Sequence, residues 1–218
     1  MALGGFSMIL ILLQAQSIYP NKTIGFLLTY TSIVVLAVLA YKFYKEDDRT
    51  SDSYYRGRRG ESVILEELKK LPAEFRVFCD VKIQPPYNID FVVAGPTGVF
   101  IIEVKSHAGK IDYQNSRISI NGLVPQEKDF LKQAKGEARS VADYLKNKAV
   151  NISWVHSILA FSHPSATLRF GLKPLDDVFV VGRSFLRKLI QEPRGPQHPE
   201  GTLLELEKVL IPLVPPEK

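Results

Sequence analysis

The feature that most constrains this chain is an abrupt change in charge after Tyr44. The first 44 residues contain two charged side chains, Lys22 and Lys42, whereas charged residues are frequent in the remainder. The uncharged run from Ile24 to Tyr41 is close to the ~20 apolar residues that a helix needs to cross a bilayer. The sequence therefore predicts three parts, which are a membrane anchor over residues 1–44, a polar linker over residues 45–56 and a globular domain over residues 57–218.

The segment that precedes this run is apolar as far as Leu13, and Pro20-Asn21 at its end is typical of a turn. We interpret it as the first membrane-spanning helix of a hairpin. A signal-like segment is the alternative, but the basic residues that open a signal peptide are missing from the sequence. Basic residues cluster between Lys42 and Arg59, so the positive-inside rule predicts that the C-terminal domain lies in the cytoplasm.

Composition excludes some classes of site. The single cysteine, Cys79, excludes an internal disulfide framework, and without a C-x-x-C pair a structural zinc site is not expected. The net charge of +5 is compatible with a polyanionic partner such as nucleic acid.

Periodicity in the globular part alternates between that of helices and that of strands. This order indicates an α/β domain with a central mixed β-sheet flanked by helices. The expected helices are 57–71, 126–148, 184–190 and 203–210. The expected strands are 75–83, 88–94, 99–105, 157–161 and 178–181, with a small hairpin over 110–113 and 117–120.

Three charged residues fall inside apolar strands. Asp90 lies in Asn-Ile-Asp-Phe-Val-Val-Ala, and Glu103 and Lys105 lie in Phe-Ile-Ile-Glu-Val-Lys-Ser. Charges in such runs are costly unless they are paired or bound. Glu103 and Lys105 are two residues apart, so they share one face of their strand.

The turn between these strands decides where Asp90 points. If Pro96-Thr97 is a two-residue loop, Asp90 lies opposite Glu103, and two carboxylates so close favour a hard cation such as Mg²⁺ or Mn²⁺. A three-residue loop with a bulge at Gly98 would instead place the two acids on opposite faces. Both registers are open at this point.

A third carboxylate, Glu61, shares the apolar stripe of the first predicted helix, although a glutamate in a first helical turn also interacts favourably with the helix dipole. Lys105 also has two interpretations. It forms a salt bridge with a neighbouring carboxylate, or it stabilises negative charge on a phosphate.

The ordered set Gly57-Arg58-Arg59-Gly60-Glu61, Asn88-Ile89-Asp90 and Gly98 to Ser106 resembles the nuclease-related domain (NERD). That domain is similar to the PD-(D/E)XK endonuclease superfamily, so the resemblance implies a restriction-endonuclease-like fold. It implies that Asp90 and Glu103 bind Mg²⁺ (or Mn²⁺), with Glu61 as a further metal ligand. It also makes Lys105 the catalytic lysine and Gln133 a residue of the same site.

Two hypotheses follow. The first is a membrane-anchored, metal-dependent nuclease that hydrolyses phosphodiester bonds of DNA, or of RNA, on the cytoplasmic side. The second is a non-catalytic nuclease-like module that binds nucleic acid or a protein partner at the membrane. The basic residues expected to contact nucleic acid are Arg56, Arg58, Arg59, Lys110, Lys132 and Lys135.

Overall fold

The computed structural model describes residues 22–83, 88–126, 128–152, 154–171, 173–193 and 197–216. The chain divides into two compact units, Met1–Tyr54 and Tyr55–Lys218. The boundary lies close to the expected start of the globular domain at Gly57. Residues 2–19, expected to form the first arm of a hairpin, lie outside the described residues.

The first described element is helix α2, Lys22–Leu68, which is 47 residues long. It includes residues 45–56, which were expected to form a linker, and ends at Leu68, three residues before the expected end of the helix at residue 71.

The predicted membrane anchor, and with it the predicted cytoplasmic side, is wrong for the part of the chain that the structure describes. None of its helices is long and apolar enough to cross a membrane. In the sequence, Thr29 to Ser32 divide the run that starts at Ile24, and the uninterrupted apolar stretch that follows, Ile33 to Ala40, has eight residues. A helix needs about 20 such residues to cross a bilayer.

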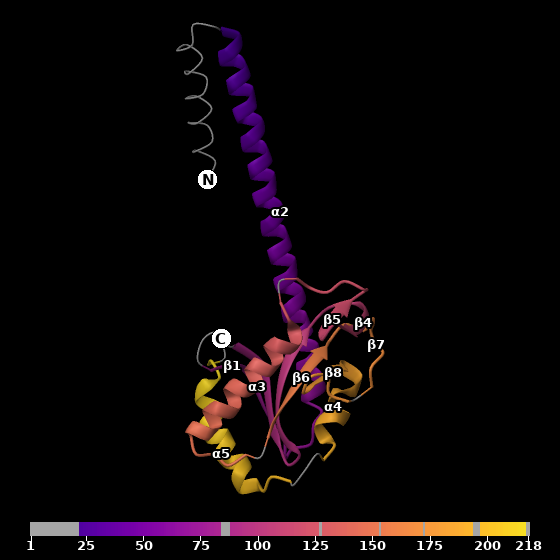
Figure 1. The fold of residues 1–218 in the computed structure, drawn as a ribbon. Coiled ribbons are helices and arrows are strands. Elements are labelled where there is room, and N and C mark those ends of the chain that lie inside the picture. Colours follow the sequence, from indigo (N-terminus) through magenta and orange to yellow (C-terminus); the bar gives the residue numbers. More distant parts are fainter. Residues whose placement is uncertain are drawn as a thin grey trace. The chain divides into compact units, whose positions relative to one another are not determined.

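A five-stranded mixed sheet forms the centre of the second unit, in the order β1-β2-β3-β6-β8 (Figure 1). Strands β1, β2 and β3 pair antiparallel, whereas β3, β6 and β8 pair parallel. The prediction of a central mixed sheet flanked by helices is therefore confirmed. The strands are β1 Arg76–Lys82, β2 Asn88–Gly95, β3 Gly98–Lys105, β6 Val155–Phe161 and β8 Val178–Gly182.

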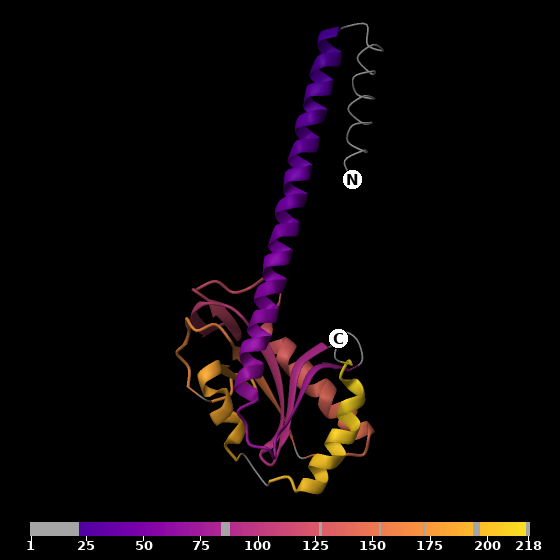
Figure 2. The same ribbon diagram turned by 180° about the vertical axis from the view of Figure 1, so that it is seen from behind.

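Helices cover both faces of this sheet (Figures 1 and 2). On one face, Val141 and Leu145 of α3 and Leu206 of α5 pack on Val92 and Ile101 of the sheet. On the other, the end of α2 and helix α4 pack on alternate residues of β2 and β3. These helices are α3 Phe130–Asn147, α4 Arg183–Gln191 and α5 Glu200–Leu210, and a 3₁₀ turn, η1 Ile211–Leu213, follows α5.

A second, three-stranded sheet in the order β5-β4-β7 follows the end of β3 in the chain. Strands β4, Gly109–Gln114, and β5, Arg117–Ile120, form the expected hairpin. Strand β7, Ala166–Leu168, pairs parallel with β4 and was not predicted, because three residues are too short to show an alternating pattern. The small sheet packs against the start of α3, where Ile111 of β4 and Ile118 of β5 share a buried cluster with Phe130 of α3.

Candidate active site

The β2–β3 connection is the two-residue turn Pro96-Thr97, because Gly95 pairs with Gly98. The turn is held from outside by hydrogen bonds from Thr97 Oγ1 to the Ile190 carbonyl (2.5 Å) and from the His198 amide to the Pro96 carbonyl (2.8 Å). The structure therefore excludes the bulged, three-residue alternative.

This register carries along both strands to the pair Phe91–Ile102. Asp90 and Glu103 are the next residues on the two strands, at the end of the hairpin far from the turn. Asp90 Oδ2 accepts a hydrogen bond of 2.8 Å from the Val104 amide, which ties the first carboxylate to the strand that carries Glu103 and Lys105.

Lys105 connects this pair to helix α3. Its Nζ contacts Glu103 Oε1, and the two side chains are 12% and 6% exposed. It also donates to Gln133 Oε1 at 3.3 Å and lies 4.7 Å from the centre of the Phe130 ring. The structure thus brings Gln133 to Lys105 through the first two turns of α3.

A buried acid that the sequence reasoning missed completes this chain of contacts. Glu137 is 2% exposed, and its Oε1 accepts a hydrogen bond of 2.9 Å from Gln133 Nε2. Among the described residues, its Oε2 has no hydrogen-bond partner. A signal was present, because Glu137 follows Gln133 by four residues and precedes Val141 by four, so it lies on the apolar stripe of α3.

Glu61 reaches the same region from α2. Helix α2 approaches β3 and β6 closely at Gly60, where a Cβ atom would lie 2.7 Å from Ser162 Oγ and 3.1 Å from Ser106 Cβ. A side chain at position 60 would therefore require the two serine side chains or the helix to shift, so Gly60 permits the close approach that brings Glu61 to this region. Burial raises the pKa of the half-buried Glu61 carboxyl, Arg58 opposes this, and Asp80 and Glu103 add to it.

The electrostatics of the site are dominated by buried negative charge. Burial raises the pKa of Asp90 to about 7, helped by Glu103 and Glu61 and opposed by the hydrogen bond from Val104 and by Lys105. Burial also raises the pKa of Glu137 to about 8, helped by Glu103 and Asp90 and opposed by Gln133 and Lys105. Glu103 disfavours ionisation of Glu61, Asp90 and Glu137 alike, so the group as a whole favours added positive charge.

The basic residues expected to contact nucleic acid are in different environments. Arg56, Arg58, Arg59 and Lys132 are exposed. Lys110 forms an ion pair of 2.5 Å with Asp112, and Lys135 forms ion pairs with Asp176 (2.9 Å) and Asp177 (3.5 Å). Arg58 and Arg59 precede Glu61 within one turn of α2, so they are nearest in sequence to the acidic group.

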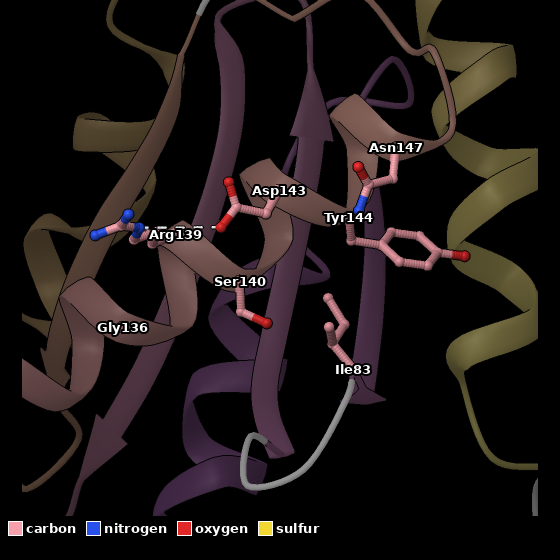
Figure 3. Close-up of a pocket in the computed structure, with 7 residues that line it drawn as sticks. All are labelled: Ile83, Gly136, Arg139, Ser140, Asp143, Tyr144 and Asn147. Carbon is pink, nitrogen blue, oxygen red and sulfur yellow. Dashed lines mark ion pairs between the residues drawn. The ribbon is translucent and has the colours of Figure 1, made fainter.

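Neither a ready-made metal-binding cluster nor a surface hollow marks the position of the candidate active site. In the parts of the chain that the structure describes, three or more His, Cys, Asp or Glu side chains are nowhere grouped closely enough to hold a metal ion. A hollow of about 310 Å³ lies along α3 beside Ile83 (Figure 3). Its lining includes the solvent-exposed pair Arg139–Asp143 and none of the acids of the site, so its chemistry does not match that of a catalytic centre.

Comparison with known families decides what the domain is. The sequence model of the family described as NERD, nuclease-related domain, matches residues 56–162. The chain carries a nuclease-related domain. Every acid of the site described above, together with Lys105 and Gln133, lies within the match, and so do the motifs from Gly57 to Ser106 that carry the resemblance. No curated protein and no solved structure matches the chain.

A nuclease-related domain indicates a nuclease-related function, with nucleic acid as the partner. Within the NERD match, the structure groups Asp90, Glu103, Lys105 and Gln133. It also brings α2 with Glu61 to the same end of the strands, close enough for Glu103 to affect the Glu61 carboxyl. It adds Glu137, and it adds Asp80 of β1 as a further negative charge near Glu61.

Proposed function

We propose that the protein is a divalent-cation-dependent nuclease that hydrolyses phosphodiester bonds, with DNA as the first candidate substrate. The observation that carries the proposal is the grouping of the buried Glu103, the half-buried Asp90 and Lys105 at the end of the β2–β3 hairpin. Asp90 is tied to the β3 backbone, and Lys105 is held between Glu103 and Gln133.

The side chains fit a hard cation in their chemistry. All the available ligands are carboxylate oxygens, which Mg²⁺ and Mn²⁺ prefer. The Val104 amide bonds Asp90 Oδ2 and not Oδ1. Burial first, and the Glu103 carboxylate second, raise the pKa of Asp90, and a bound cation would oppose both effects by stabilising the ionised carboxylate. Mg²⁺ is commonly held by one or two carboxylates and otherwise by water and phosphate, so three grouped acids are not required.

In this proposal, Asp90 and Glu103 hold the ion and Glu61 is the further carboxylate. When bound, such an ion supplies Lewis-acid stabilisation of the phosphate and lowers the pKa of a water molecule. The Lys105 ammonium, restrained by Glu103, Gln133 and the Phe130 ring, stabilises the negative charge that develops on a phosphate oxygen. The exposed Arg58 and Arg59 hold the flanking phosphates of the substrate.

The test measures cleavage and metal affinity on the same variants of the full chain. Duplex DNA, single-stranded DNA and RNA are incubated with Mg²⁺ or Mn²⁺, and with chelator as the blank. Asp90→Asn and Glu103→Gln are expected to lose both cleavage and Mn²⁺ affinity, because each removes one negative charge at nearly constant shape. Lys105→Met is expected to lose cleavage but keep Mn²⁺ affinity, because an ammonium group is not a ligand.

Glu205→Gln, an exposed acid on α5, is the matched control and should behave as wild type. Cleavage at the wild-type rate by any one of the three site variants would refute the proposed mechanism. Binding of nucleic acid without cleavage under every metal condition would identify the domain as a non-catalytic binding module.

A further inference from the structure

Glu137 is the feature of this domain that the proposed mechanism leaves unused. Among the residues that the structure describes, it is one of two acids that are almost fully buried, the other being Glu103. Removing a carboxyl group from water costs free energy that its partners must offset. Glu137 has one hydrogen-bonded oxygen and, in the described structure, one without any partner, so its contacts offset this cost only in part.

The contact that Glu137 does make determines the direction of the Gln133 amide. The amide group offers an acceptor at Oε1 and donors at Nε2, and the two ends are not interchangeable. Oε1 faces the Lys105 ammonium, which can only donate, while Nε2 donates to Glu137 Oε1. An acceptor at position 137 therefore favours the one amide orientation that presents oxygen to Lys105.

Lys105 depends on this orientation for part of its own position. Its Nζ contacts Glu103 on the strand, lies over the Phe130 ring, and donates to Gln133 from the third direction. With the amide reversed, NH₂ would face the ammonium and the third contact would be lost. A misplacement of about 1 Å in a catalytic group can lower a rate about 100-fold.

We propose that Glu137 is a positioning residue for the reaction, which acts through Gln133 to hold the Lys105 ammonium in place. This inference rests on the proposed nuclease function. The geometry for this role comes from helix α3. Gln133 and Glu137 are four residues apart on it, so they lie about one turn apart on the same face.

A structural role is the alternative, since Gln and Glu four residues apart also stabilise a helix. The two roles differ in sign. A structural residue loses stability when it is replaced, whereas Glu137 carries a buried oxygen without a partner and neighbouring negative charge, so an apolar replacement should stabilise the fold. Function and stability should therefore change in opposite directions.

The experiment compares Glu137→Met and Glu137→Gln with wild type in the full chain. Methionine is of similar length and has no carboxyl, so we expect a higher melting temperature and a kcat that is lower by about 10- to 100-fold. KM should stay unchanged, because Glu137 does not touch the substrate. Glutamine keeps an oxygen acceptor for Gln133 and should restore kcat to within about threefold of wild type.

Side-chain NMR tests the same inference without any cleavage. Lys105 Nζ lies 4.7 Å from the centre of the Phe130 ring, so the adjacent ε-methylene should show a ring-current shift. The Gln133 NH₂ group donates to Glu137, so its protons should exchange slowly with solvent. These signals are assigned with Lys105→Met and Gln133→Leu. Both should move toward free values in Glu137→Met and stay near wild type in Glu137→Gln.

Each outcome supports or overturns the inference. Loss of both melting temperature and kcat in Glu137→Met, without recovery in Glu137→Gln, would identify a structural residue. Unchanged Gln133 and Lys105 signals in Glu137→Met would also overturn it. A wild-type chain that does not cleave would remove the proposed nuclease function, while the NMR comparison would still decide whether Glu137 positions Lys105.

Discussion

The buried acids predict an unusual dependence of stability on pH, which Glu137→Gln should remove in large part. The folded state holds a proton on Glu137 up to about pH 8, whereas the unfolded chain releases it near the ordinary value of 4.5. Because the pKa is raised on folding, this stabilisation is complete below about pH 4.5 and is lost as the pH rises through 8. Asp90, with a pKa of about 7 against 3.8, changes stability in the same direction.

The size of the effect follows from the interval over which only the folded state is protonated. Each pH unit in that interval changes the free energy of unfolding by about 1.4 kcal/mol. Between pH 5 and pH 8, Glu137 therefore accounts for roughly 4 kcal/mol, part of which is shared with Asp90 because the Asp90 carboxylate raises the pKa of Glu137. For a domain of this size, that corresponds to a change in melting temperature of roughly 10 °C.

The assay is urea unfolding followed by circular dichroism at pH 5, 6, 7 and 8, in chelator so that no cation compensates the charge. Wild type should lose stability steadily over this range. Glu137→Gln, which cannot ionise, should match wild type at pH 5 and exceed it by several kcal/mol at pH 8. The exposed Glu205→Gln variant controls for the loss of one negative charge and should follow wild type.

Parallel stability curves for wild type and Glu137→Gln would refute this reasoning. They would mean that Glu137 is ionised in the folded state at every pH tested, and that its buried carboxylate is compensated in a way that its hydrogen bond with Gln133 does not explain.

Two further predictions concern α2 and the basic residues. Nucleic-acid binding, measured by filter-binding titration, should weaken as the salt concentration rises. Arg59→Ala should lower the slope of log affinity against log salt concentration by about one. Lys135→Ala should lower this slope less, because Lys135 is already paired with two aspartates. Gly60→Ala should destabilise the domain by about 1–3 kcal/mol in urea unfolding, because its Cβ would collide with the side chains of Ser162 and Ser106, which directly follow β6 and β3. Gly57→Ala, which meets nothing within 4 Å, should instead stabilise helix α2 by about 0.5–1 kcal/mol; equal effects at the two positions would contradict the close approach.

The central part of the site could be predicted because it depends on short-range rules. Two strands joined by a turn of fixed length have only one register for each loop length, and the structure selected the two-residue loop between Gly95 and Gly98. Strand periodicity then placed Glu103 and Lys105 on one face. The resemblance supplied Gln133, whose position relative to Lys105 depends on how α3 packs.

The parts that were missed depend on long-range packing. Whether Glu137 is exposed or buried is decided by which face of α3 meets the sheet, and an acid on an apolar stripe was not recognised as a member of the site. Asp80 has positive φ (52°) within β1, a conformation that its neighbours in sequence do not indicate. Helix α2 continues through residues 45–56 where no periodic apolar pattern marks it.

The Pro96-Thr97 turn has a consequence for how this domain tolerates insertions and deletions. Surface turns usually accept changes of length, and this one lies at the far end of the hairpin from Asp90 and Glu103. Adding one residue, however, would shift the pairing by one position and separate the two acids, although the hydrophobic composition of both strands would be unchanged. A library of length variants in this turn should therefore retain function only where the original spacing is kept, so that a turn remote from the two acids is one of the least permissive to changes of length.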